Sequence, residues 1–295
     1  MSVKGKIVTD MIRFFTSQKM LGPKIQDGTL RKNLVEPPWH CPDEYLNLPI
    51  HMRQFEMELL TPKAADNGEV VLQLHGGGYI AKIRNAYRDF AVRYSKINQY
   101  RVLSVDYRVA PQHPYPAAFQ DAIEAYRWLL YSGFSGDRII LAGDSAGGGL
   151  VLALAMYLRD QSMPLPKKLV MMSPWTDLTA SGPSYQENYE NDPLFGNTRE
   201  SMIYNGEYAG KQNPKLPYIS PLFGDFHGLP PMLFQVGSLE MLLSDSVLAA
   251  QKAKEADCDV TLTVYQDMFH VFQLSMDKLA ESRAAWDEVA AFLGK

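Results

Sequence analysis

Short apolar runs alternate with segments of helix length from residue 70 to the end of the chain. Runs with the length and composition of buried strands lie at residues 70–74, 102–105, 138–142, 169–172, 232–236 and 260–264. This alternation predicts an α/β fold, in which a parallel sheet is covered by helices. Residues 54–60 have a weaker pattern, which we interpret as an additional antiparallel edge strand.

Composition narrows the class of protein. The 295 residues are 46% hydrophobic, which is enough to bury one large core. Lys plus Arg is 29 and Asp plus Glu is 33, so the net charge of −4 offers no basic field for a nucleic-acid backbone. Cys41 and Cys258 are too few for a disulfide scaffold, so we expect free thiols. Without a signal-peptide pattern or an apolar run of membrane-spanning length, a cytoplasmic protein is expected.

The chain divides into unequal parts. Residues 1–45 are interpreted as an N-terminal helical cap or flap, and residues 46–295 as the α/β domain. Between residues 181 and 228 the alternation lapses, which suggests an insertion above the sheet that contributes to the cap. Apolar side chains that define the two expected helical faces of the flap are Met11, Ile12, Phe14, Phe15, Leu30 and Leu34. The tyrosines of the insertion, expected to belong to a solvated or self-packed loop, are Tyr185, Tyr189, Tyr204 and Tyr208.

A G-x-S-x-G element occupies residues 143–147, with Ser145 at its centre. The expected strand at 138–142 enters it, and residues 148–159 read as a helix that leaves it. Glycines beside a serine in such a strained turn avoid collisions between Cβ atoms and the neighbouring strand and helix. The N-terminus of the helix also favours negative charge. The context predicts a nucleophile elbow, with Ser145 as nucleophile.

Three consecutive glycines follow the strand at 70–74, in the sequence His-Gly-Gly-Gly-Tyr of residues 75–79. Their exposed backbone N–H groups, together with the N–H of Ala146, can converge on the oxyanion of a tetrahedral intermediate. The Lys-Ser/Thr pair of a phosphate-binding Walker loop and the spacing of a dinucleotide-binding loop are both missing. We therefore predict an oxyanion hole, with a glycine-rich turn without function as the alternative.

The general base must be a histidine that follows Ser145, because chains with this elbow place nucleophile, acid and histidine in that order. Of the six histidines only His227 and His270 do so. His227 precedes the strand at 232–236, whose far end should supply the acid, so it comes too early. His270, in the loop after the strand at 260–264, is the predicted base.

Two carboxylates follow the strand at 232–236, and the sequence leaves the choice between them open. Asp245 stands beside Ser244 at the start of a helix running to about residue 256, where helix capping and the helix dipole explain a carboxylate. Glu240 lies closer to the carboxyl end of the strand, in the otherwise apolar run Leu-Glu-Met-Leu-Leu. We favour Glu240 as the acid because it lacks such a local explanation.

Three segments together resemble the hormone-sensitive-lipase-like family of α/β-hydrolases, the bacterial family IV carboxylesterases. They are HGGGYI at 75–80, DYRVAPQHPYPAA at 106–118 and GDSAGG at 143–148, in this order and spacing. Weaker matches at 177–179 and 217–231 extend the resemblance over residues 70–295. It implies an α/β-hydrolase fold with a mostly parallel, eight-stranded sheet flanked by helices, an N-terminal helical cap, no cofactor, and hydrolysis of short acyl esters.

The resemblance also implies roles for single residues. Gly77, Gly78 and Ala146 match the oxyanion donors of the family, and His75 matches a residue that orients the loop, so neither a catalytic nor a metal-binding role is expected for His75. Residues 106–108 match a structural turn that His113 is expected to help hold. Phe272 matches a phenylalanine that follows the family's histidine by two residues. Relatives carry Asp or Glu as the acid, which keeps both Glu240 and Asp245 open.

The predicted function is that of a serine carboxylesterase, in which Ser145 attacks the ester carbonyl and His270 carries the proton. Within the enzyme class, the alternatives are a deacetylase of acetylated sugars or small metabolites and an amidase such as an arylformamidase. The alternative from another class is a non-catalytic small-molecule receptor on the same fold, against which the retained His270 argues. The expected partner is a small ester, and an edge strand could pair two subunits into a homodimer.

Overall fold

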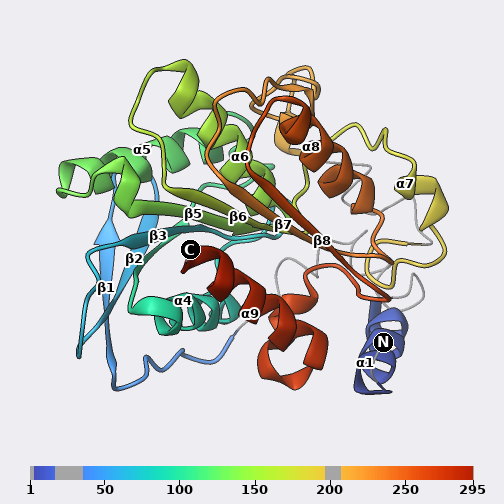
Figure 1. The fold of residues 1–295 in the computed structure, drawn as a ribbon, viewed down its shortest axis with the longest axis horizontal. Coiled ribbons are helices and arrows are strands. Elements are labelled where there is room, and N and C mark those ends of the chain that lie inside the picture. Colours follow the sequence, from blue (N-terminus) through green and yellow to red (C-terminus); the bar gives the residue numbers. More distant parts are fainter. Residues whose placement is uncertain (1–2, 17–35, 197–206, 295) are drawn as a thin grey trace.

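An eight-stranded sheet forms the centre of the protein, in the computed structural model that describes residues 3–16, 36–196 and 207–294 (Figure 1). The strand order is β1-β2-β4-β3-β5-β6-β7-β8. The pairs β1–β2 and β2–β4 are antiparallel, and all other neighbouring pairs are parallel. The strands are β1 (Tyr45–His51), β2 (Glu56–Pro62), β3 (Val70–Leu74), β4 (Arg101–Asp106), β5 (Ile139–Asp144), β6 (Lys168–Met172), β7 (Met232–Gly237) and β8 (Val260–Tyr265). The predicted α/β class and the mostly parallel sheet are confirmed.

The prediction that residues 54–60 form an edge strand is wrong in its position. The strand exists as β2 and is antiparallel, but it lies between β1 and β4. The edge strand on this side of the sheet is β1, whose Leu46 and Leu48 side chains are 50% and 53% exposed. Because Leu46 and Leu48 are exposed, the apolar residues of β1 do not mark a buried face. The sequence therefore lacks the alternation of buried apolar and exposed polar residues that indicates a strand.

Helices cover both faces of the sheet (Figure 1), with α4 and α9 on one side and α5, α6 and α8 on the other. Phe90 of α4 and Trp286 of α9 belong to one buried cluster, whereas Leu150 of α6 belongs to the other. Two apolar faces explain why the parallel strands read as continuous apolar runs. The helices are α1 (Val3–Thr16), α4 (Asn85–Asn98), α5 (Ala117–Tyr131), α6 (Ser145–Asp160), α7 (Ser184–Glu187), α8 (Leu243–Glu255) and α9 (Ala280–Leu293), and the short 3-10 helices are η1 (Gly136–Arg138), η2 (Glu207–Ala209), η3 (Pro221–Phe223) and η4 (Phe272–Lys278).

The N-terminal helix α1 approaches the loop that carries His270. Val8 packs against a buried cluster that includes Met268, Phe269 and Phe272. Met11 is 53% exposed. Of the other predicted flap residues, Leu30 and Leu34 lie outside the described residues, as do the side chains of Ile12, Phe14 and Phe15. The boundary of the flap at residue 45 therefore stays a prediction.

The insertion between residues 181 and 228 lacks strands in its described parts, 181–196 and 207–228. Tyr185 and Tyr208 are buried in the main core, where the Tyr208 ring stacks on Tyr79 with centroids 3.7 Å apart, so the expectation of a solvated or self-packed loop is wrong for these two residues; Tyr204 lies outside the described residues. Both cysteines are free, as predicted. Within the described ranges, none of the helices combines the length and the apolar character needed to cross a membrane.

Candidate active site

Ser145 stands at a sharp turn between β5 and α6. Its φ of 52° lies in the left-handed region, which non-glycine residues seldom adopt. A Cβ atom on Gly147 would collide with the carbonyl oxygen of Leu74, and one on Gly143 would lie 2.5 Å from the carbonyl oxygen of Gly147. Only glycine therefore fits on either side of the turn. The helix begins at Ser145 itself, three residues earlier than predicted, so its N-terminus lies directly at the serine.

The structure brings Ser145, His270 and Glu240 into one chain of hydrogen bonds. Ser145 Oγ lies 2.9 Å from His270 Nε2, and His270 Nδ1 lies 2.8 Å from Glu240 Oε2. The three side chains follow the carboxyl ends of β5, β8 and β7, respectively. These strands are parallel, so their carboxyl ends lie along the same edge of the sheet. All three are buried, which strengthens the electrostatic interactions between them.

The Glu240 carboxylate is fixed by more than the histidine. Its Oε1 atom accepts hydrogen bonds from Ser173 Oγ at 2.7 Å and from the N–H of Gly237 at 2.5 Å. Ser173 Oγ in turn accepts the N–H of Val271, the residue after His270, at 3.2 Å. Ser173 thus joins the loops of acid and base. The sequence analysis missed it, and the one available signal was a polar residue immediately after the strand β6.

In the described residues Asp245 makes no hydrogen bond to the histidine and does not cap a helix. Its Oδ2 atom accepts the backbone N–H groups of Thr176 and Asp177, at 2.7 and 2.8 Å. No side-chain hydrogen bond caps the start of α8. The interpretation of Asp245 as a helix cap is therefore wrong, because its carboxylate is drawn to a loop almost 70 residues earlier in the chain. Burial raises the pKa of Asp245 to about 8, and the nearby Asp177 carboxylate raises it as well.

The glycine loop supplies unpaired backbone donors beside the serine turn. Gly77 and Gly78 have φ values of 112° and 62°, which glycine tolerates best. Within the described parts of the chain, their N–H groups donate no hydrogen bond, while Gly77 accepts two through its carbonyl oxygen. Ala146 is the first residue after Ser145 in α6, where backbone N–H groups lack helical acceptors.

Asp144 connects the glycine loop to the serine turn. Its Oδ1 atom accepts the N–H of Gly76 at 3.0 Å, and its Oδ2 atom accepts the hydroxyl of Tyr87 at 3.1 Å. Burial raises the pKa of Asp144 to about 7, although the bonds from Tyr87 and Gly76 oppose this shift. Asp144 therefore fixes the start of the loop against the residue that precedes Ser145.

His75 has a structural environment, as the resemblance implied. Its ring stacks on Tyr107, with centroids 4.2 Å apart, and its Nδ1 atom lies 2.7 Å from the carbonyl oxygen of Gly76. Burial lowers the pKa of His75 to about 4, so the ring is neutral near pH 7. Tyr107 also donates its hydroxyl to the His75 carbonyl oxygen at 2.5 Å. In the described residues, no group of three or more side chains is arranged to hold a metal ion.

The turn at residues 106–108 is held by carboxylates. Asp106 accepts the N–H of Ile83 at 2.9 Å, and Arg108 donates to both carboxylate oxygens of the buried Asp121 in a bidentate ion pair. His113, which is expected to help hold this turn, takes part only through its backbone. The imidazole is exposed and makes no hydrogen bond in the described residues, and the backbone N–H of His113 donates to Val109.

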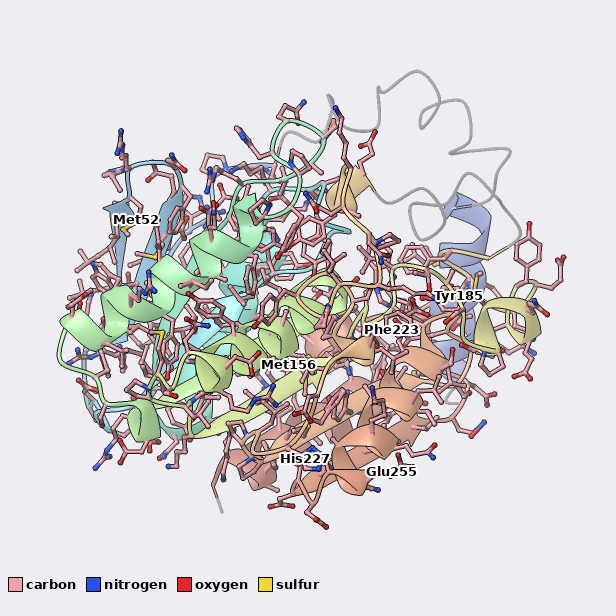
Figure 2. The ribbon with its side chains drawn as sticks, turned by 90° about the horizontal axis from the view of Figure 1, so that it is seen from above. Met52, Met156, Tyr185, Phe223, His227 and Glu255 are labelled. Carbon is pink, nitrogen blue, oxygen red and sulfur yellow. The ribbon has the colours of Figure 1, made fainter. Side chains whose placement is uncertain are left out.

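His227, the other histidine after Ser145, is remote from this chain of hydrogen bonds. It lies near Glu255 at the end of α8, well separated from Tyr185 (Figure 2). Its ring pairs with the exposed carboxylate of Asp225 at 2.7 Å. This placement agrees with the choice of His270 as the predicted base.

Comparisons with known proteins agree with this geometry. A family described as having the alpha/beta hydrolase fold matches residues 71–274. An acetyl-hydrolase of Streptomyces hygroscopicus is 38% identical over 230 residues, which are 78% of this chain and 77% of that protein. The crystal structure of EstE5 soaked with p-nitrophenyl butyrate has a TM-score of 0.89 at 33% identity, covering 99% of this chain and 98% of EstE5. An esterase from the bacterial hormone-sensitive lipase family has a TM-score of 0.85 at 35% identity, with the same coverage.

Fold, site and relatives together define the class: the chain belongs to the α/β-hydrolase family. Within that family it is a carboxylic ester hydrolase of the hormone-sensitive-lipase-like group.

Proposed function

We propose that Ser145, His270 and Glu240 are the catalytic triad of a serine carboxylesterase. The observation that carries this proposal is the continuous hydrogen-bonded chain from Ser145 Oγ through both ring nitrogens of His270 to Glu240. Such a chain lets the histidine accept the serine proton, while the carboxylate orients the ring and stabilises the imidazolium that forms.

The reaction has two halves. Ser145 Oγ attacks the ester carbonyl carbon while His270 Nε2 takes the hydroxyl proton, and the tetrahedral oxyanion is bound by the N–H groups of Gly77, Gly78 and Ala146. When the intermediate collapses, the carbon–oxygen bond to the alcohol breaks and His270 protonates the departing alcohol. Water, deprotonated by His270, then attacks the acyl-enzyme and releases the acid with restoration of the Ser145 hydroxyl.

Short-chain acyl esters are the proposed substrates. One relative is an acetyl-hydrolase, and another was soaked with a butyrate ester, so both names refer to small acyl groups. The test measures kcat/KM for p-nitrophenyl esters from acetate to laurate. We expect the highest values for acetate or butyrate and a steep fall for longer chains. Equal or higher values for laurate would reject the short-chain assignment.

The same assay separates the alternatives. Substantial turnover of p-nitrophenyl acetate by the wild type, with none by Ser145→Ala, supports an esterase and rejects a non-catalytic receptor. Turnover of acetylated sugars or of N-formyl arylamines well above that of simple esters would favour the deacetylase or the amidase. Independence from cofactors, a cytoplasmic location and a homodimer stay predictions from the sequence.

A further inference from the structure

A short part of the insertion binds the loop that carries Glu240. We name residues 184–195 the clamp segment and residues 238–242 the acid loop; Tyr185, labelled in Figure 2, lies at the start of the clamp segment. Ser184 Oγ donates to the carbonyl oxygen of Met241 at 2.6 Å. Asn188 Nδ2 donates to two carbonyl oxygens of the acid loop, at 3.0 and 2.8 Å. Asp192 Oδ2 accepts the N–H of Met241 at 2.8 Å. Three polar side chains, each four residues apart, therefore hold the acid loop through its backbone.

The Asp192 side chain differs from those of Ser184 and Asn188 because it also accepts hydrogen bonds from within the clamp segment itself. One carboxylate oxygen, Oδ2, accepts the N–H of the residue that follows Glu240. The other oxygen, Oδ1, accepts the N–H groups of Leu194 and Phe195, at 2.8 and 3.0 Å, and so shapes the turn at the end of the clamp segment. Asp192 is 4% exposed, which strengthens these three hydrogen bonds.

The turn shaped by Asp192 places an aromatic ring against the histidine. The ring centroids of Phe195 and His270 lie 4.7 Å apart, with an angle of 58° between the planes. Both ring nitrogens of His270 are already engaged, one by Ser145 and one by Glu240. Phe195 therefore adds an aromatic contact to the imidazole, which limits rotation of the ring.

We propose that Asp192 is a positioning residue for the esterase reaction, because a single carboxylate fixes both the loop of Glu240 and the turn that holds Phe195 against His270. This inference rests on the proposed function of the triad. Asp192 does not touch the reacting atoms. It acts through the acid loop, which carries Glu240, and through Phe195, which contacts His270. Loosening it should displace the acid and the base relative to Ser145, and a displacement of about 1 Å can lower turnover on the order of 100-fold.

The Asp192→Asn variant tests this role with little change in volume. An amide has only one oxygen, so it cannot accept hydrogen bonds toward Met241 and toward the turn at Phe195 at once. We expect kcat for p-nitrophenyl acetate to fall by roughly 10- to 100-fold while KM changes by less than about threefold. Wild-type kcat, or a loss confined to KM, would reject the positioning role.

A double-mutant cycle separates positioning from general damage. If Asp192 acts through Glu240, then Asp192→Asn should lower kcat by less than about threefold in a Glu240→Gln background. A loss that is undiminished both in that background and in a Phe195→Ala background would show that Asp192 acts independently of the acid and of the aromatic contact, and would overturn the proposal.

Asp177 offers a matched control. It is also buried and organises a turn by accepting the N–H groups of Thr179 and Ser181, at 2.8 and 2.9 Å. Among the described residues, its carboxylate makes no hydrogen bond to the acid loop. Asp177→Asn should lower the thermal midpoint about as much as Asp192→Asn and leave kcat within about threefold of the wild type. Equal losses of kcat in the two variants would assign the effect to a loosened turn and reject the proposal.

Ser145→Ala, measured in the same assay, keeps the two hypotheses apart. An active Ser145→Ala variant rejects the proposed function itself. An inactive Ser145→Ala variant beside a fully active Asp192→Asn variant rejects only the positioning role.

Discussion

Glu240 Oε2 lies 2.8 Å from His270 Nδ1, while Oε1 of the same carboxylate accepts the hydroxyl of Ser173. The carboxylate is fully buried, and its two oxygens have separate partners. Its orientation is therefore set before any substrate binds, and so is the orientation of the imidazole ring. This arrangement makes Glu240, and not Asp245, the group whose charge should govern the proposed base.

Replacing Glu240 with Gln should lower kcat on the order of 10⁴-fold with the fold retained, because the amide can no longer stabilise the imidazolium. Circular dichroism and p-nitrophenyl acetate kinetics measure the two effects. Asp245→Asn is the matched control and should keep kcat near the wild-type value. An inactive Asp245→Asn variant beside an active Glu240→Gln variant would reverse the assignment.

Asp245 should make the protein less stable as the pH rises. Its pKa of about 8 in the folded protein exceeds the value of roughly 4 expected in an unfolded chain, so the folded state binds the proton more tightly. The resulting stabilisation is complete below about pH 4 and is lost as the pH rises toward 8. Asp245→Asn keeps a neutral acceptor at this position. Urea unfolding at pH 5 and pH 8 should show a smaller loss of unfolding free energy in this variant than in the wild type, whereas equal losses would contradict the shift.

Gly77→Ala should lower turnover by at least roughly 10²-fold, the value of one oxyanion donor. The new Cβ atom would lie 2.8 Å from the Cβ of Ala81, and a φ of 112° is strained for alanine, so the loop must move. Gly68→Ala is the matched control, since Gly68 also has a positive φ, of 76°, but no atom within 4 Å of an added Cβ. It should cost some stability and leave turnover unchanged. Normal activity in Gly77→Ala would mean that the loop is only a turn.

Deleting residues 1–35 should reduce ester turnover more than it reduces secondary structure. Val8 packs beside the loop of His270, and this support is lost, whereas the strands of the sheet remain complete. The deletion ends before Glu36, so that its hydrogen bonds are retained. Glu36 accepts hydrogen bonds from Arg84, the N-cap of α4, and from Asn85, the first residue of that helix. Circular dichroism beside ester kinetics measures both effects. A deletion variant that fails to fold would assign the segment to the core.

The parts of this structure that could be predicted from the sequence depend on neighbouring residues. The strand, the turn with its glycines and the helix around Ser145 lie within about 20 residues, so one local pattern specifies them. The parallel strands could also be predicted from the sequence, because burial on both faces of the sheet produces continuous apolar runs. The edge strand β1 was missed because its leucines 46 and 48 are exposed.

Contacts between distant segments left no such pattern. Asp245 was interpreted as a helix cap because a cap is recognised from residues adjacent in the sequence. Its carboxylate instead accepts the backbone N–H of Thr176, 69 residues away. Ser173 and Asp192 meet the acid loop 67 and 49 residues later in the chain. A serine after a strand and an aspartate before a proline have common local explanations, so only the folded chain reveals these contacts.

Covalent labelling of Ser145 tests the central claim most directly. A p-nitrophenyl alkylphosphonate, which traps an activated serine, is incubated with the wild type and with Ser145→Ala, and the peptides are mapped by mass spectrometry while esterase activity is followed. The proposed function predicts one adduct per chain, on Ser145, formed in parallel with loss of activity, and neither adduct nor activity in Ser145→Ala. Inactivation with the adduct on another residue, or a Ser145→Ala variant that still hydrolyses the ester, would contradict it.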